Sequence, residues 1–222
     1  KELYEEDPRK APTIFFIKAG EHEVEVSVDE DDEDEEGREN QLLITYPMKI
    51  IGTGRDKTII HGGFKIKGTN EAGKRVDMQG MTMKGSSRDG LLASNGLSFL
   101  CKEMTFTQCG YSGVYAKHTK GRLINCVVTQ CGDCGIWCRR TALVELKGDQ
   151  TKVDGNVTSG IGGYYGLKTT HTSSTIHLLF PLTKESVSTN NHGGQNYGSY
   201  NGGTIKTVDS FETSCSSIPG TL

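Results

Sequence analysis

Alternating hydrophobic and polar residues recur in three similar segments near the middle of the chain. The segments are Met81–Ala93, Met104–Ala116 and Cys126–Cys138, and they align without gaps at offsets of 23 and then 22 residues. Each contains an alternating run, a turn, a glycine and a second alternating run. Alternation with a period of two is typical of β-strands, whereas helices need a period near 3.6. A fixed repeat of such short strands predicts a β-solenoid in which every repeat forms one coil.

The repeat also predicts which side chains point into the solenoid. Residues one repeat apart should lie on adjacent coils, separated by the spacing of hydrogen-bonded strands, about 4.8 Å. Gly90, Gly113 and Gly135 are therefore expected at equivalent corners. The small and apolar residues that flank these corners are expected to face inward: Leu91, Val114 and Ile136; Ala93, Ala116 and Cys138; Met81, Met104 and Cys126; Met83, Phe106 and Val128.

The rest of the sequence extends the solenoid in both directions. Gly166 and Gly198 continue the glycine series at longer intervals, so Asp149–Gly163 and Lys184–Gln195 are expected to leave the coils as loops. We predict an all-β fold, a right-handed parallel β-helix of about eight coils over residues 12–210, with an extension over 1–11 and a tail over 211–222. The upstream strands are expected at Thr13–Ile17, Val24–Val28, Leu42–Thr45, Lys49–Ile51, Thr58–Ile60 and Phe64–Ile66.

One upstream stretch resembles a known family. Pro47–Ile60 (PMKIIGTGRDKTII), followed by Gly62–Ile66 (GGFKI), is similar to the opening coil of pectin-lyase-like β-helix proteins. The coils over residues 99–138 resemble the repeats of the F-box β-helix proteins and of the carbohydrate-binding and sugar-hydrolase β-helix class. The resemblance implies the fold over residues 12–210. It selects no function, because the class includes lyases, hydrolases, epimerases and non-catalytic modules.

Composition agrees with a single domain of short strands and tight turns. The chain has 222 residues, of which 34% are hydrophobic and 29 are glycines. Its net charge of −3 includes the acidic run Asp29–Glu36, which we expect to be a solvated loop. No apolar run reaches membrane-spanning length and no signal peptide is recognisable, so no membrane association is expected. A charge balance that is not basic disfavours nucleic acid as a partner.

The seven cysteines are expected to be stacked free thiols rather than disulfides or metal ligands. The repeat places Cys131 over Cys109, and inward cysteines behave as small hydrophobic residues. Cys131-Gly-Asp-Cys134 imitates half of a zinc site, but zinc needs four converging ligands. We predict no cofactor, and we expect Cys134, at a turn, to be the most exposed thiol. Unpaired thiols favour the cytoplasm or another reducing intracellular compartment.

The acidic residues give little support to catalysis. A hydrolase or lyase of this fold needs carboxylates that gather on one outer sheet. In the alignment, however, Asp89 lies over Ser112 and Cys134, and Asp133 lies over Tyr111. We therefore predict no catalytic residues, with a polysaccharide lyase or glycoside hydrolase of the pectin-lyase-like class as the alternative. Isolated acidic candidates remain at Asp133, Glu145, Asp149 and Asp154.

The outward positions suggest a binding face instead. Tyr115 and Trp137 are one repeat apart, and the extended alignment continues this column to Lys168 and Tyr200. Aromatic and cationic groups in a row suit stacking on sugar rings or pairing with acidic peptide groups. We predict a non-catalytic binding module for an acidic peptide segment or an acidic glycan. A purely structural solenoid, with these aromatics covered by its own loops, is the second alternative. The other candidate binding residues are Lys117, His118, Arg139, Arg140 and His171.

Overall fold

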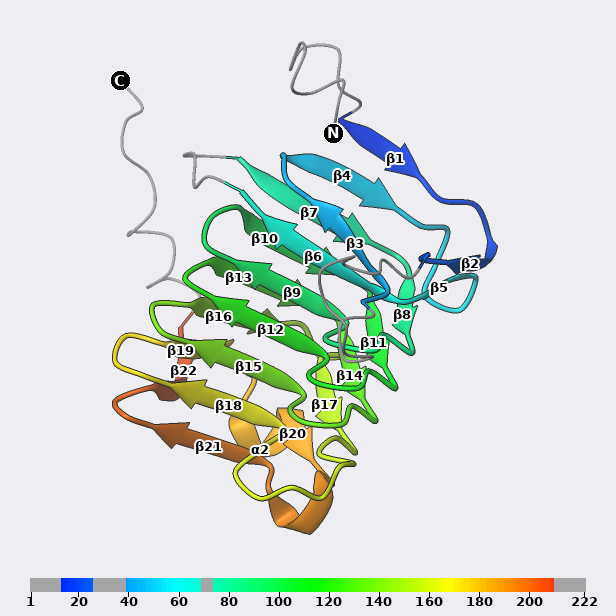
Figure 1. Cartoon of the computed structure of the whole chain (residues 1–222). Helices are drawn as coiled ribbons and strands as arrows, with labels where there is room; N and C mark the ends of the chain where they lie inside the picture. The colour runs from blue at the N-terminus through cyan, green and yellow to red at the C-terminus, as the bar shows by residue number, and fades with distance from the viewer. Residues whose placement is uncertain (1–12, 26–38, 69–73, 210–222) are drawn as a thin grey trace, which may run out of the picture.

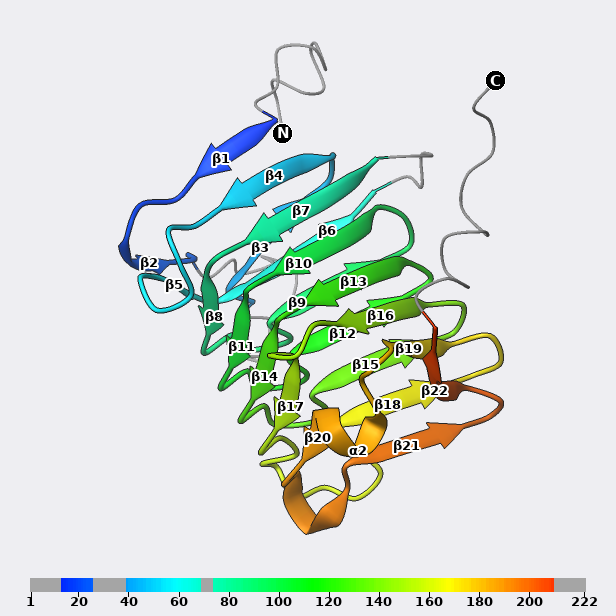
Figure 2. The ribbon, with the colours of Figure 1, turned by 180° about the vertical axis from the view of Figure 1, so that it is seen from behind.

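The computed structural model describes residues 13–25, 39–68 and 74–209, which form three parallel β-sheets wound into a right-handed β-helix (Figures 1 and 2). Consecutive strands of the chain belong to the three sheets in turn. Each strand therefore pairs with the strand three places later in the chain. The sheets hold eight, seven and seven strands, and the number of complete coils is therefore smaller than the eight predicted. The predicted fold class is confirmed.

Each sheet is a ladder of one strand per coil, which we call sheet A, sheet B and sheet C. Sheet A contains β1 (Ile14–Phe16), β4 (Met48–Ile51), β7 (Arg75–Gln79), β10 (Ser98–Lys102), β13 (Lys120–Ile124), β16 (Leu143–Lys147), β19 (Thr175–Leu179) and β22 (Thr204–Val208). Sheet B contains β2 (Gly20–Glu23), β5 (Thr58–His61), β8 (Thr82–Lys84), β11 (Thr105–Thr107), β14 (Val127–Thr129), β17 (Lys152–Asp154) and β20 (Ser188–Thr189). Sheet C contains β3 (Gln41–Ile44), β6 (Gly63–Lys67), β9 (Leu91–Ser94), β12 (Val114–Lys117), β15 (Ile136–Arg139), β18 (Leu167–Thr170) and β21 (Tyr197–Tyr200).

The inward columns predicted from the repeat form the core. All twelve of the predicted side chains, from Met81 to Cys138, are fully buried. The glycines also stack as predicted, because Leu91 N–H donates to the Gly113 carbonyl and Val114 N–H donates to the Gly135 carbonyl. Since each coil buries its apolar side chains against the coils above and below, the core runs along the whole axis.

The thiols lie inside this core. Six cysteines fall within the described residues, and all are buried. Cys131 lies over Cys109, as predicted, and each thiol donates to a backbone carbonyl of its own coil, Cys131 to Thr129 and Cys109 to Thr107. The prediction that Cys134 is exposed is wrong, since this side chain is fully buried. The next coil covers it, and Gly135 N–H donates to the Tyr165 carbonyl there. Burial raises the pKa of Cys134 to about 12.

The register of the last coils differs from the prediction. Lys168 pairs with Gly198, and Thr170 pairs with Tyr200, so Tyr200 does not continue the Trp137–Lys168 column. Gly166 lies over Asn196 rather than over Gly198, because Leu167 N–H donates to the Asn196 carbonyl. The two glycines were aligned from similar neighbouring residues, but this coil is two residues shorter than that alignment requires.

Other segments depart from the prediction at their boundaries. The upstream strands match to within one or two residues, except that β2 precedes the predicted Val24–Val28. The predicted loops contain regular structure: β17 in the first, and α2 (Lys184–Val187), β20 and η2 (His192–Gly194) in the second. The extension over 1–11, the acidic run Asp29–Glu36 and the tail over 211–222 lie outside the described residues. Across the described ranges no helix has the length and apolar character needed to cross a membrane.

Candidate ligand-binding groove

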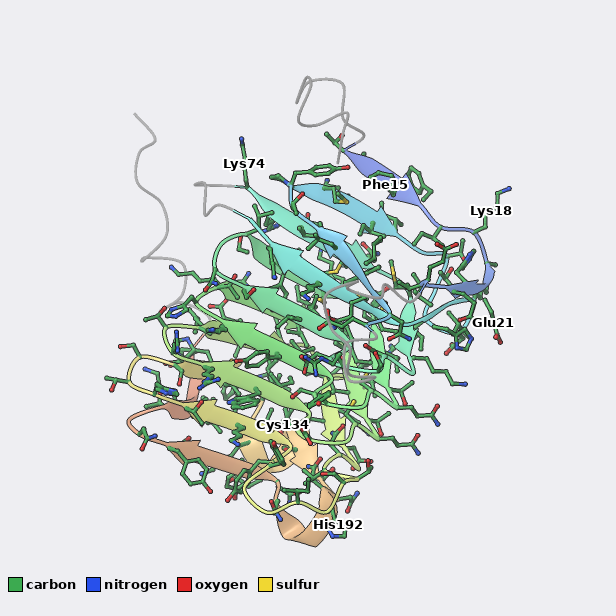
Figure 3. All side chains as sticks on the ribbon, in the orientation of Figure 1. Phe15, Lys18, Glu21, Lys74, Cys134 and His192 are labelled. Carbon is green, nitrogen blue, oxygen red and sulfur yellow. The ribbon has the colours of Figure 1, made fainter. Side chains whose placement is uncertain are left out.

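A groove of about 250 Å³ crosses the outer face of sheet C, near the ends at which its strands begin. Strands β3, β9, β12 and β15 contribute to it, together with the turns that precede β9, β12 and β15. Sheet C faces the viewer in Figure 1, and Cys134, labelled in Figure 3, marks the turn that enters β15. The lining residues are Glu39, Gln41, Arg88, Asp89, Leu92, Tyr111, Ser112, Tyr115, Asp133, Trp137 and Arg139.

The predicted column of Tyr115, Trp137 and Lys168 is present, since these residues pair across β12, β15 and β18. The rings of Tyr115 and Trp137 lie 5.0 Å apart, and Lys168 Nζ lies 4.5 Å from the Trp137 ring centre. The ring centres of Trp137 and Tyr164 lie 6.3 Å apart in an edge-to-face arrangement, and Trp137 Nε1 donates to Thr170 Oγ1 at 3.0 Å. Trp137 is therefore half-buried among these neighbours. Partial cover of this aromatic side chain agrees in part with the alternative of a purely structural solenoid.

The remaining predicted residues are divided between the groove and a corner. Arg139 lines the groove, whereas Lys117 pairs with it on the preceding strand and is absent from the lining. His118, Arg140 and His171 occupy equivalent positions in the turn after sheet C, each with a positive φ. His118 Nε2 lies 3.3 Å from Arg140 Nη1, and its Nδ1 lies 3.0 Å from Thr141 Oγ1.

These cations have few acidic partners. Within the described part of the chain, no ion pair engages the column lysine or any of the other predicted cationic residues. Arg139 instead lies over the Trp137 ring at 5.8 Å, and its Nε is buried without a hydrogen-bond partner. His171 Nδ1 is buried without a partner as well. This edge of sheet C thus carries positive charge that no ion pair among the described residues engages, although the Lys168 charge acts on the nearby Asp133.

Asp89 also lines the groove, and it was not predicted from the sequence. Its Oδ1 accepts a hydrogen bond from Ser112 N–H at 2.9 Å, and its carbonyl accepts from Ser86 Oγ and from Gln41 Nε2. Burial raises the pKa of Asp89 to about 7, against the lowering effect of Ser112 and of the Arg88 charge, and the charge of Asp133 adds to the rise. A carboxyl group that is half protonated near neutral pH can donate as well as accept.

Asp133 was predicted only as an isolated acidic candidate. In the structure it lines the same groove as Asp89. Its side chain is 7% exposed. Burial raises its pKa, while the Lys168 charge and hydrogen bonds from Tyr164 and Ser159 oppose the rise. The alignment placed it in a different column from Asp89. Two side chains at different positions of different coils can still line one cavity. The alignment compares only equivalent positions, so it did not pair Asp89 with Asp133.

Glu39 supplies the third carboxylate of the groove, and it is already paired. Lys65 Nζ lies 2.5 Å from Glu39 Oε2, and Arg88 Nε lies 3.4 Å from Oε1. Burial would raise the pKa of Glu39, but these two cations outweigh it and the pKa is lowered. Arg88 also donates to the Tyr111 hydroxyl at 3.2 Å and lies over its ring. Arg88 thereby fixes the Tyr111 side chain, which is 44% exposed.

Two buried polar atoms of the groove lack partners. Gln41 is only 8% exposed, and its Oε1 has no hydrogen bond although its Nε2 donates to Asp89. Arg139 Nε is the other. A buried polar group without a hydrogen bond costs about 1–3 kcal/mol. Both atoms have almost no accessible surface, so a guest would reach them only if these side chains turned toward the groove.

Metal ligation has no comparable support in this region. Among the residues that the structure describes, no group of three or more His, Cys, Asp or Glu side chains could hold a metal ion.

Comparisons with known proteins add a likeness of fold. No protein-family model matches the chain, and no curated protein matches it. The solved structure of the Azotobacter vinelandii mannuronan C-5 epimerase AlgE4 A-module is similar, with a TM-score of 0.40 and 13% sequence identity. The match covers 93% of this chain and 83% of that one. The epimerase activity is a property of that protein, and the fold described above rests on the strand order and register of this chain.

Proposed function

We propose that the sheet C groove binds an acidic glycan without cleaving it. The observation that carries the proposal is the lining of the groove, where the rings of Tyr111 and Tyr115 lie in one cavity with Arg139, which forms no ion pair among the described residues. In a bound complex, Tyr111 and Tyr115 stack against the apolar faces of sugar rings. Gln41 accepts a hydrogen bond from a sugar hydroxyl, and Arg139 pairs with a carboxylate of the guest.

The choice of glycan over peptide follows from the chemistry of the lining. Tyrosine rings, an amide and carboxyl groups are suited to a guest with many hydroxyls and flat apolar ring faces. The cationic edge formed by Arg139 in the groove and by Arg140 and Lys168 outside its lining supports an acidic guest, because none of the three forms an ion pair in the described ranges. A strand of peptide would need exposed backbone groups to pair with, and the strands of sheet C from β6 to β18 are already paired on both edges.

Calorimetric titration tests the proposal. The probes are hexasaccharides of galacturonate and of mannuronate, a neutral glucose hexasaccharide and a glutamate-rich peptide. We expect an acidic hexasaccharide to bind, and Arg139→Ala and Tyr115→Ala each to weaken it about tenfold or more. Lys117→Ala is the matched control, because this residue lies outside the groove lining and should change mainly the salt dependence.

Two results would overturn the proposal. One is the absence of binding to every saccharide. The other is binding that neither Arg139→Ala nor Tyr115→Ala weakens. Binding to the glutamate-rich peptide alone would assign the groove to a protein partner instead. Fluorescence of Trp137, the single tryptophan of the chain, should follow the titration because its ring contacts Tyr115.

A second candidate function is cleavage of the bound glycan. It is favoured by the presence of Asp89 and Asp133 in one groove, which the column alignment did not show. A carboxyl with a raised pKa could protonate the leaving oxygen while the other carboxylate activates water. The test is the release of reducing ends or unsaturated products from polygalacturonate and alginate. Turnover that disappears in both Asp89→Asn and Asp133→Asn would replace binding with catalysis as the function.

A further inference from the structure

We propose that Asp89 meets the acidic guest in its protonated form and donates a hydrogen bond from its carboxyl O–H to a guest oxygen, so that binding takes up a proton. The inference rests on the proposed function of the groove and adds a residue with a defined chemical role. It also makes the affinity for the guest depend on pH in a predictable direction.

The first support is the fixed position of the carboxyl group. Ser112 holds it through its backbone N–H, at 2.9 Å from Oδ1, and through its hydroxyl. The backbone of Asp89 is held as well, because its carbonyl accepts hydrogen bonds from Ser86 and Gln41. A side chain held in the wall of a groove makes a directional contact at little cost in conformational entropy.

The second support is the balance of charge around Asp89. Of the cations near the groove, Arg88 is engaged by Glu39 and by the Tyr111 ring, and Arg139 lies over Trp137. Among the described residues, none forms an ion pair with Asp89. The titratable and charged groups that line the groove with it are Glu39, Arg88, Tyr111, Tyr115, Asp133 and Arg139. The charges of Arg88 and Asp133 act on Asp89, and the charge of Asp89 acts on the thiols of Cys131 and Cys134. Burial and the neighbouring Asp133 charge favour the neutral carboxyl, and the pKa of Asp89 is raised to about 7.

The third support is the chemistry of an acidic guest. Two ionised carboxylates cannot share a close contact in a poorly solvated site. When one of them is protonated, the same contact becomes a charge-assisted O–H···O⁻ hydrogen bond, which is short and strong. A carboxylic acid kept neutral by its surroundings can serve as a donor near neutral pH. An acidic guest next to Asp89 therefore raises the pKa of Asp89 further and binds together with a proton.

The test is titration of the galacturonate hexasaccharide across pH. From about pH 5.5 to about pH 9 the guest stays ionised, so a change in affinity reports on the protein. For the wild type we expect constant affinity up to about pH 7 and then a loss that approaches tenfold per pH unit. Titrations at about pH 8 in two buffers of different ionisation enthalpy should show uptake of close to one proton per guest.

Three variants make the assignment specific. Asp89→Asn keeps a donor that does not titrate, so it should bind with little dependence on pH. Asp89→Ala loses the donor and should bind weakly at every pH. Asp154→Asn is the matched control, because Asp154 lies on sheet B, where Thr189 and Asn190 donate to it outside the groove. This control should keep the wild-type profile.

The outcomes separate the two proposals. A wild-type affinity that is independent of pH, or a pH dependence that persists in Asp89→Asn, overturns the role of Asp89 while leaving the binding function intact. Absence of binding at every pH overturns the binding function itself. Binding of the neutral hexasaccharide provides a further check, since without a guest charge its loss of affinity above about pH 7 should be smaller.

Discussion

Lys168 and Trp137 lie on adjacent coils, with the ammonium Nζ 4.5 Å from the centre of the indole ring. The same Nζ lies 4.7 Å from the Tyr164 ring, so one cation is shared between two aromatic side chains. Such contacts contribute about 0.5–1 kcal/mol at exposed sites and more where water is excluded. Trp137 therefore supports the groove from within, and the more accessible Tyr111 is left to meet a guest directly.

This arrangement predicts that Trp137 matters for stability as well as for binding. Trp137→Ala should lower the free energy of unfolding by about 2–3 kcal/mol, because it removes a half-buried ring and strands the Thr170 hydroxyl. Trp137→Phe keeps a ring and should lose only about 1 kcal/mol, the value of the Nε1 hydrogen bond. Urea unfolding followed by circular dichroism measures both. Equal stability of wild type and Trp137→Ala would contradict the supporting role.

The corner glycines should tolerate no side chain. A Cβ at Gly113 would lie 2.2 Å from Val128 Cγ1, inside the core. Gly113→Ala should therefore cost about 1–3 kcal/mol through overpacking. Gly162→Ala is the control, since a Cβ there meets no atom within 4 Å. A Gly113→Ala protein as stable as the control would show that the corner relaxes at no cost.

Asp89 should make the stability of the protein depend on pH. Its folded pKa of about 7 is well above the ordinary value of 3.8, so the folded state holds this proton more tightly than the unfolded state does. The contribution of Asp89 to stability is thus fully present below about pH 4 and is lost as the pH rises through about 7. Asp89→Asn removes this loss, and the variant should gain stability relative to wild type at about pH 8 but not at about pH 4. The denaturant midpoints of wild type and Asp89→Asn at the two pH values measure this difference. The control Asp154→Asn should show no such difference from wild type.

Asn191 should be essential to the last coils. It is 2% exposed, and its Nδ2 donates to the carbonyls of Val153 and Thr189 while its Oδ1 accepts from Asn156 N–H. Asn191→Ala leaves these buried groups unpaired and should cost about 2–4 kcal/mol. Hydrogen exchange should show the loss concentrated around β17 and β20. Uniform exchange along the chain would contradict a local role.

The sequence predicted the fold where the coils have equal length. Leu91, Val114 and Ile136 stack because offsets of 22 and 23 residues leave the strand register unchanged. The prediction failed at Tyr200 because longer coils place their extra residues in loops, and the local likeness around Gly166 and Gly198 does not record how many residues a loop takes up. Burial of Cys134 was missed for a related reason, since the alignment did not show that the next coil closes over this turn.

Some residues of the groove had been predicted to point outward, although the groove itself had not been predicted. Tyr115, Trp137 and Arg139 were identified from one column and its neighbour, because outward positions follow directly from alternation. Asp89 and Gln41 were not. Gln41 comes from β3, two strands earlier in sheet C than β9, and its approach to Asp89 depends on the irregular first coils. The repeat predicts which residues of adjacent strands pair. The shape of a cavity between a sheet and its turns depends on side-chain conformations, which the repeat does not predict.

The groove also brings together coils that are not adjacent in the solenoid. Gln41, Asp89 and Asp133 belong to the first, third and fifth strands of sheet C or to the turns before them. In a solenoid each coil is stabilised by its immediate neighbours, so coils at an end can open one after another while the middle stays closed. A guest that contacted all three residues would fasten five coils together, and the end coils could open only after it had left.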